Sequence, residues 1–501
     1  MSFPVANSQP SGSLGWRARA MAELTRGPLD VLVVGGGIVG AGIARDAALR
    51  GLRTGLVEQH DFAFGTSSRS SRLLHGGLRY LAQGRIGLVR EASLEKRILH
   101  HIAPHLAAPL AFIFPAYRGD PHWALWQLKI GVKVYDLLCG GRNLGKSTWL
   151  SRDEVLQQAP ALSGEGLAGA VRYYDGFTND ARLTLDTLRS AAGNGAAVLS
   201  YCRFNQAARE ALWECEVQDA PTGQKRAVQA RAVVNATGPW AGGLPHSRVK
   251  IRPTKGIHLV VQRERLPVPD SIVMTQGERI LFAIPWGQRT ILGTTDTDYS
   301  GPIEDVRAEA SDIAYILDIA NRFFPNARLR DTDLLSVWAG LRPLIAGPKG
   351  APSDVSRSHE IRSPEPGWWD VAGGKLTTYR LMAEQTVDRI VKWLERGQGN
   401  GAFGQCRTAE EPLLPPDQTT GLSSILPPQP SSRAVEHYVN SEWSLHLDDV
   451  MLRRTSWHYY SAEAPKLAER VADWMSVLLG WSAEARAAEL DRYTRATGIP
   501  R

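Results

Sequence analysis

The chain has 501 residues, which is enough for two to four structural units with an ample core. Its composition, 43% hydrophobic and 22% charged, is ordinary for a soluble globular protein. The net charge of +7 favours an anionic substrate, a nucleic acid or an anionic membrane surface, without choosing among them.

Simple counts exclude several classes of protein. The cysteines form no CxxC pair, so we expect neither a metal site nor a disulfide framework, and such thiols suit a reducing cytoplasm. No apolar run reaches the length of a transmembrane helix, because the longest, at residues 107–117, contains two prolines. Residues 1–29 lack the apolar core of a secretory signal, and we expect them to form a flexible tail.

The apolar patterns predict a strand–helix–strand unit near the start of the chain. Residues 30–34 are typical of a buried parallel strand, residues 38–50 of a helix and residues 54–57 of a second strand. Strands are also expected at 231–240 and at 368–380, where the strand leads into a helix from about 378 to 394. Three stretches between them have the pattern of an antiparallel sheet: 256–262, 279–286 and 289–296.

The last part of the chain has a different character. Residues 400–432 are rich in proline, glycine and serine, which predicts a linker. Residues 433–496 have helical periodicity and predict a small, all-helical C-terminal domain. The neighbouring charges within it are expected to form ion pairs on a helix surface: Asp448, Asp449, Arg453 and Arg454.

Residues 122–138 form a helical pattern that allows two interpretations. Apolar side chains recur at spacings of three and four residues, at Trp123, Trp126, Ile130, Val134 and Leu137. Two lysines four residues apart add positive charge. A basic amphipathic helix with tryptophan can lie in a membrane interface, and a core helix with solvated lysines is the alternative.

A glycine-rich turn predicts a dinucleotide site. Gly35, Gly37 and Gly40 fit GxGxxG between the first strand and its helix, where bare backbone permits a tight turn, an approach to a pyrophosphate and close helix packing. Glu58 ends the second strand and suits a ribose hydroxyl. The motif does not separate NAD from FAD. "NATGPW", with Thr237 and Gly238, and "GGKLTTYR" supply further turns that a long cofactor could use.

Several longer motifs carry a family resemblance. "GGGIVGAGIARDAALRGL", "TSSRSSRLLHGGLRYL", "NATGPWA", "KGIHLVV", "LGTTDTDY", "AGLRPL", "GGKLTTYR" and "EWSLHLDDVMLRRT" occur in this order. Together, from about residue 30 to residue 495, they resemble the FAD-dependent glycerol-3-phosphate dehydrogenase family.

The resemblance implies an α/β flavoprotein fold of the D-amino-acid-oxidase type. A discontinuous, Rossmann-like FAD domain (about 30–80, 175–250 and 340–399) would join an antiparallel-sheet substrate domain (about 81–174 and 251–339), with a helical C-terminal domain at 433–501. It further implies that several motif residues touch FAD: Gly35, Gly37, Ile38, Gly40, Glu58, Thr66, Ser67, Ser68, Thr237, Gly238, Gly374, Leu376 and Thr377.

The implied reaction is oxidation of sn-glycerol 3-phosphate to dihydroxyacetone phosphate, with hydride passing from C2 to flavin N5 and electrons passing on to a quinone. An oxygen-using oxidase is the alternative function, and a non-catalytic flavin-binding regulatory protein is a third hypothesis. The protein would then be cytoplasmic or peripheral on the inner membrane face, in contact with anionic lipid. A homodimer is a candidate assembly, and no nucleic-acid partner is expected.

A phosphorylated alcohol needs cations and a base. A phosphate dianion favours arginine forks and lysine point charges, and the candidates in the motifs are Arg79, Arg342, Arg357 and Lys375. We expect Arg79, Arg342 and Lys375 to be catalytic as well as substrate-binding.

Two histidines in the motifs, His75 and His258, are candidates for the general base. Either could instead only hydrogen-bond the flavin or the core. Tyr80 is a candidate hydrogen-bond donor to the substrate.

Overall fold

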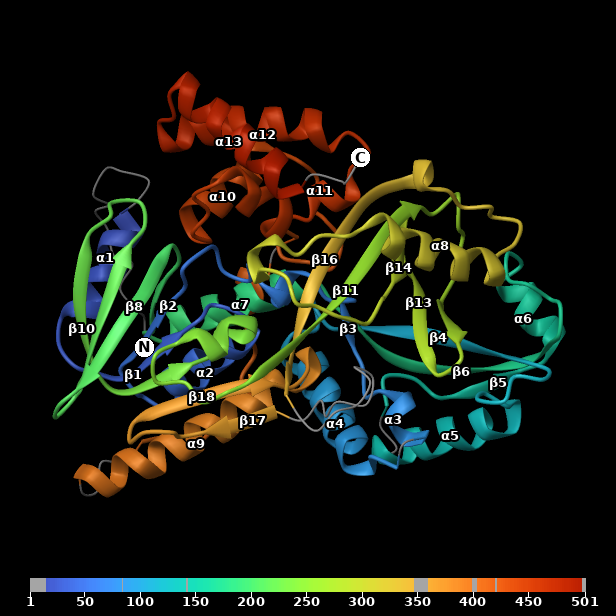
Figure 1. The fold of residues 1–501 in the computed structure, drawn as a ribbon, viewed down its shortest axis with the longest axis horizontal. Helices are drawn as coiled ribbons and strands as arrows, with labels where there is room; N and C mark the ends of the chain where they lie inside the picture. Colours follow the sequence, from blue (N-terminus) through green and yellow to red (C-terminus); the bar gives the residue numbers. More distant parts are fainter. Residues whose placement is uncertain are drawn as a thin grey trace.

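Two β-sheets form the body of the molecule, and a layer of C-terminal helices lies against them (Figure 1). The computed structural model describes residues 15–82, 84–140, 143–346, 359–398, 403–419 and 421–497. The FAD-type α/β architecture expected from the motifs is confirmed, with its second sheet and helical C-terminal region.

The first sheet grows from the predicted strand–helix–strand unit. β1 (Leu29–Val34) lies between the parallel strands β2 (Thr54–Val57) and β10 (Lys225–Asn235). The sheet continues through two parallel strands, β18 (Trp368–Gly373) and β7 (Ala197–Leu199), and ends at the antiparallel β17 (His359–Arg362). Cover on both faces of the sheet buries residues 31–34 of β1, which explains why this stretch is wholly apolar.

Both faces of this sheet are covered. One face packs against α2 (Ile38–Leu49), α7 (Asp180–Gly193) and α9 (Tyr379–Gln398). The other is covered by β8 (Cys202–Arg209), β9 (Trp213–Asp219) and α1 (Gly15–Thr25). The structure thus places residues 15–25 of the expected flexible tail in a packed helix, because Leu24 is buried and Arg17 donates a hydrogen bond to the carbonyl oxygen of Ser200.

The second sheet is mainly antiparallel, as its alternating patterns predict. Its strands are β3 (Leu73–Leu74), β4 (Ala108–Tyr117), β5 (Thr148–Leu150), β6 (Leu167–Phe177), β11 (Ile251–Gln262), β12 (Ser271–Gln276), β13 (Arg279–Trp286), β14 (Arg289–Gly293), β15 (Thr297–Asp298) and β16 (Leu334–Ile345). One core lies between this sheet and two helices, α6 (Arg152–Gln158) and α8 (Ala310–Phe323). At the β4–β6 end it packs against α3 (Leu78–Ala82), α4 (Ile86–Ile102) and α5 (Leu125–Leu138).

The apolar stripe of α5 faces outward. Leu128, Val132 and Tyr135 form its buried face. Trp126, Ile130 and Leu137 are 64%, 57% and 74% exposed. Trp149 of β5, also exposed, lies beside them with its ring 4.8 Å from Lys129 Nζ. The helix therefore packs in the core through one face, as the second interpretation predicts, but three side chains of its apolar stripe are exposed. No helix in the described part of the chain is long and apolar enough to cross a membrane.

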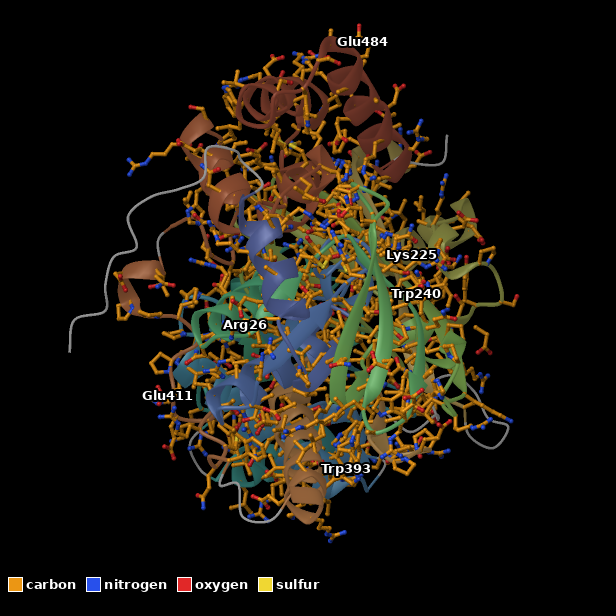
Figure 2. All side chains as sticks on the ribbon, turned by 90° about the vertical axis from the view of Figure 1, so that its left-hand side faces the viewer. Arg26, Lys225, Trp240, Trp393, Glu411 and Glu484 are labelled. Carbon is orange, nitrogen blue, oxygen red and sulfur yellow. The ribbon has the colours of Figure 1, made fainter. Side chains whose placement is uncertain are left out.

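The C-terminal helices form a layer of their own, with Glu484 at its outer end (Figure 2). They are α10 (Ser432–Ser441), a π-helical turn η8 (Asp449–Arg454), α11 (Trp457–Tyr460), α12 (Ala464–Leu479) and α13 (Ala483–Thr497). The prediction that the charges around η8 lie on a surface is wrong. Asp448, Asp449, Arg453 and Arg454 are all at most 2% exposed, because η8 packs between α7, the neighbouring C-terminal helices and the turn after β2.

The segment before these helices, expected as a linker, lies against the FAD-type unit where it is described. The Gly404 N–H donates to the carbonyl oxygen of Arg50, and the Leu413 N–H donates to that of Ile102. Leu413 is 1% exposed. The segment has little regular secondary structure, but it shares the core beside α2 and α4.

Candidate active site

A cavity of about 690 Å³ opens between the two sheets. The carboxyl ends of the parallel strands β1, β2, β10 and β18 form one wall, which is where open α/β sheets bind ligands. The second sheet supplies the other wall through β4, β6, β11, β13 and β16. All predicted cofactor-binding residues except Gly40 and Ser68 line this cavity.

The glycine turn fits a dinucleotide for reasons visible in the backbone. Gly35 has a φ of +111°, and a Cβ there would stand 2.6 Å from the carbonyl oxygen of Ala236. A Cβ on Gly40 would overlap the carbonyl oxygen of Gly35, so Gly40 lets α2 approach the turn without touching a ligand. Gly37 precedes α2 and has no side-chain cap, so the positive end of this helix faces the cavity.

Two side chains set the edges of this turn. The Glu58 carboxylate, at the end of β2, accepts hydrogen bonds from the Gly36 N–H at 2.7 Å and the His60 N–H at 2.9 Å. Burial raises the pKa of Glu58, although both amides oppose the shift. The Ser67 hydroxyl accepts the Ile38 N–H at 2.9 Å. Ser67 and Ile38 therefore fix each other where both meet the cavity.

The other predicted turns complete the candidate dinucleotide site, and together with the glycine turn they form what we call the cradle. At the end of β10, the Thr237 hydroxyl donates to Asn235 Oδ1 at 2.7 Å, and Asn235 Nδ2 donates to Asp370 Oδ1 of β18 at 2.8 Å. After β18, Gly374 has a φ of +79°, and Lys375, Leu376 and Thr377 follow along the cavity wall. The cradle has the polar groups of a dinucleotide site, with a helix N-terminus at one turn and the Glu58 carboxylate near it.

Arg342 reaches the cavity from β16. Its Nη2 donates to Thr294 Oγ1 and to the Thr295 carbonyl oxygen, each at 3.1 Å, and its Nη1 lies 3.3 Å from Asp296 Oδ1. The neighbouring strand β11 has Gly256 at this point, and only bare backbone leaves room for the guanidinium. The side chain remains 21% exposed, so a ligand in the cavity can still reach it.

Lys375 and Tyr80 lie together at the same cavity. The Lys375 Nζ is 3.9 Å from the centre of the Tyr80 ring, a cation–π contact. Arg79 lies in α3 next to Tyr80, but its side chain is outside the described part of the chain, as is the whole of Arg357.

The turn after β3 carries His75 to the cavity. The His75 N–H donates to Thr377 Oγ1 at 3.0 Å. The next amide, Gly76 N–H, donates to Tyr135 Oη of α5 at 2.9 Å, and that hydroxyl donates to Asp175 Oδ1 at 2.5 Å. The cofactor turn after β18 and the buried face of α5 therefore position this histidine together.

His258 is held more tightly. Its ring, on β11, stacks on Trp338 of β16 with ring centres 5.0 Å apart, and its Nε2 is 2.8 Å from Ser71 Oγ. Burial, reinforced by Arg342 and Arg72, keeps the pKa of His258 well below its usual value, so the ring is neutral. Within the described part of the chain, its Nδ1 has no hydrogen-bond partner.

Several site residues were not predicted from the sequence. Thr294, Thr295 and Asp296 come from "LGTTDTDY", a motif quoted without any role for its members. Ser71 and Trp338 become neighbours of His258 only through the pairing of β11 with β16 and the path of the chain before β3. Aromatic side chains also line the cavity without a local signal: Phe112, Phe114, Tyr173 and Phe282.

Comparisons with known proteins identify relatives of this chain. The FAD dependent oxidoreductase (DAO) family matches residues 30–407, so the match ends before the C-terminal helices. Glycerol-3-phosphate dehydrogenase 2 of Mycobacterium tuberculosis H37Rv is 34% identical over 98% of this chain and 92% of its own length. Aerobic glycerol-3-phosphate dehydrogenase of Bacillus subtilis is 38% identical over 79% of this chain and 73% of its own.

Solved structures extend the comparison. The glycerol-3-phosphate dehydrogenase from Bacillus halodurans, complexed with FAD, superposes with a TM-score of 0.76 at 28% identity, covering 97% of this chain and 98% of that one. The L-α-glycerophosphate oxidase from Mycoplasma pneumoniae, with FAD bound, has a TM-score of 0.59 at 18% identity over 73% of this chain and 95% of its own, which shows a shared fold.

Proposed function

Because this chain belongs to the FAD-dependent glycerol-3-phosphate dehydrogenase family, we propose that it oxidises sn-glycerol 3-phosphate to dihydroxyacetone phosphate. One observation carries the proposal: the dinucleotide cradle and two cationic side chains, Arg342 and Lys375, face a single cavity. A cofactor and a small phosphorylated alcohol can therefore meet in it.

The reaction breaks the C2–H bond and the O–H bond of the C2 hydroxyl and forms a C=O bond. FAD, which the residues of the cradle would hold, would supply the two-electron acceptor for the C2 hydride. Arg342 offers a planar fork and Lys375 a point charge, the two types of cation that hold a phosphate dianion. Their task is to fix the substrate so that its C2 hydrogen faces the cofactor.

The hydroxyl proton needs an acceptor, and we assign this task to His258, with His75 as the alternative. The support is the neutral ring of His258, whose position is fixed by Ser71 and Trp338. If Nε2–H donates to Ser71, the buried Nδ1 keeps a lone pair that no group in the described part of the chain uses. Because its pKa is low, His258 is a weak base, and we expect the proton to move together with the hydride and not before it.

For the second half of the reaction we propose a quinone as the electron acceptor. The aromatic side chains that line the cavity on β4, β6 and β13 are not needed by a small polar phosphate, but they suit a planar apolar ring. Phe112 and Tyr173 stack with ring centres 5.2 Å apart and are almost fully buried, so this wall is already formed.

We further propose that the outward stripe of α5 lies on an anionic membrane, where a lipid-soluble acceptor resides. Tryptophan and aliphatic side chains on one helix face, with lysines beside them, have the chemistry of an interfacial helix.

Anaerobic reduction tests the proposed reaction. Glycerol 3-phosphate, added without oxygen, is expected to bleach the oxidised flavin band, and Arg342→Ala should require about 30-fold more substrate for the same bleaching, since loss of a charged partner costs about 2 kcal/mol or more. Glycerol, which lacks the phosphate group, should not bleach the flavin band. A flavin that the phosphate ester cannot bleach would overturn the proposal. Hydrogen peroxide formed in near-unit yield in air would replace the quinone with oxygen as acceptor.

A further inference from the structure

The turn after β2 carries two residues that face the cofactor cavity, Glu58 at its start and Phe64 further on. Ala63, next to Phe64, has a φ of +61°, a left-handed conformation that costs a non-glycine residue roughly 1 kcal/mol. Its N–H donates to the Gly36 carbonyl oxygen at 3.0 Å. This turn needs support from outside itself to keep that shape.

Asp61, in the middle of the turn, supplies a completely buried anchor point. Its Oδ2 accepts hydrogen bonds from Arg453 Nε and, at 2.5 Å, from Arg454 Nη1, and its Oδ1 accepts Arg454 Nη2 at 2.8 Å. Both arginines belong to η8 of the C-terminal helices. A carboxylate of the cofactor turn is therefore bound by two cations that are about 390 residues away in the sequence.

The two arginines are themselves fixed. Arg454 donates through Nε and Nη2 to the Glu442 carbonyl oxygen, at 3.0 and 2.8 Å. Arg453 Nη2 donates to Asp448 at 2.8 Å and to Asp449 at 2.6 Å. With their remaining donors engaged in this way, neither guanidinium can turn away from Asp61 without breaking other buried bonds.

The contact between Asp61 and the two arginines is an ion pair. Burial by itself would raise the pKa of Asp61, but Arg454 and Arg453 outweigh it and hold that pKa below its usual value. The carboxylate is therefore ionised at neutral pH. Loss of one partner from a buried ion pair leaves an uncompensated charge, which typically costs several kcal/mol.

The same helices also contact the aromatic side chains of the turn. The Arg453 guanidinium carbon lies 5.8 Å from the centre of the Phe64 ring, and Trp443 meets Phe62 edge-on at 5.3 Å. His60 stacks on Phe64 at 4.2 Å. The turn is thus held on one side by Gly36 and on the other by the C-terminal helices.

We propose that the C-terminal helices form part of the cofactor site, with Asp61 as a positioning residue through which Arg453 and Arg454 fix the turn that presents Glu58 and Phe64. The helices would then set the affinity for FAD without touching it. The first sheet and its glycine turn would bind the cofactor only weakly when this anchor is released.

Asp61→Asn tests the proposal because it removes the charge and keeps the shape. Ser336→Ala is the control: Ser336 of β16 is also buried, and its hydroxyl donates to the Tyr459 carbonyl oxygen of α11 at 3.0 Å, so it joins the same helices to the rest of the chain away from the turn. The measurements are the FAD dissociation constant of the apoprotein and the rate of FAD release from the holoenzyme, both by flavin fluorescence.

We expect Asp61→Asn to weaken FAD binding at least tenfold, and Ser336→Ala to leave it within twofold while also lowering the unfolding midpoint. Combined with Glu58→Gln, Asp61→Asn should add much less than its separate effect, since both act through one turn. Equal FAD affinity in all variants, or equal loss in Asp61→Asn and Ser336→Ala, would overturn the proposal. If Asp61→Asn fails to fold, Arg453→Lys keeps the charge and loses the fork, and is judged by the same criterion.

Discussion

The guanidinium of Arg342 lies directly over the backbone of Gly256, where a Cβ atom would be only 2.5 Å from Nη2. On the paired strands β16 and β11, Gly256 lies opposite Gly340 and Arg342 lies opposite Thr254, so the guanidinium reaches Gly256 diagonally across the pair. The same Cβ would also crowd Thr294 Oγ1, which accepts a hydrogen bond from Arg342. Gly256 therefore holds open the place that this cation occupies.

Gly256→Ala should accordingly damage substrate binding while FAD stays bound. The added methyl group must displace the guanidinium, and we expect the KM for glycerol 3-phosphate to rise at least tenfold with a smaller change in kcat. Gly87→Ala is the matched control, because a Cβ there meets open space on α4. Steady-state kinetics on the FAD-loaded enzyme checks this, and an unchanged KM would show that Arg342 does not hold the phosphate.

Gly40→Ala should abolish FAD binding even though Gly40 does not line the cavity. Its methyl group would overlap the Gly35 carbonyl oxygen, so α2 must move away from the turn that it caps. We expect purified protein with less than a tenth of the normal flavin content. Gly193→Ala, at the open end of α7, should keep its flavin. A yellow Gly40→Ala protein with normal FAD affinity would refute this role of close helix packing.

His258 should make the fold less stable in mild acid. Its pKa in the folded protein lies well below the ordinary value near 6.5, which the unfolded chain keeps. Below pH 6.5, His258 therefore binds a proton in the unfolded state but not in the folded state. The free energy of unfolding then falls as the pH falls. Above about pH 7.5 the residue has no such effect.

His258→Gln removes this proton linkage. Unfolding midpoints measured from pH 7.5 to pH 5.0 should fall less steeply for His258→Gln than for the parent protein, whatever the offset between them at pH 7.5. Parallel curves would mean that His258 has the same pKa in the folded and the unfolded protein, so that the folded protein also binds the proton in mild acid. Such a result would also remove the support for a neutral ring as proton acceptor.

The exposed stripe of α5 should decide membrane binding. Replacing Trp126, Ile130 and Leu137 together by serine removes its apolar surface, while the buried face of the helix is left intact. We expect at least a tenfold loss of binding to vesicles with about 30% anionic lipid, measured by sedimentation, and an unchanged elution volume on gel filtration. Val477→Ser, an exposed apolar side chain of α12, is the control and should bind as before. A change of oligomeric state with vesicle binding intact would assign the stripe to a second copy of the chain.

The sequence by itself was sufficient for features that depend on neighbouring residues. β1, α2 and β2 are encoded by an apolar run, a glycine turn and a second apolar run, and β2 lies at the predicted residues 54–57. Gly35 and Gly40 act within the same turn, so their roles follow from local geometry. The position of Glu58 follows from the end of β2 at Val57. The cavity could thus be predicted at the correct edge of the first sheet.

Only the tertiary structure decided which residues far apart in the sequence form ion pairs or ring contacts. No pattern near Asp61 in the sequence predicts its ion pair with Arg454. The charges of η8 have the spacing of surface ion pairs, and only the folded structure shows that they are buried. In the same way, Ser71 and Trp338 meet His258 through strand pairing and chain path. Local pattern follows from periodicity and backbone sterics along the chain, whereas burial and electrostatic partnership depend on which surfaces the folded chain brings together.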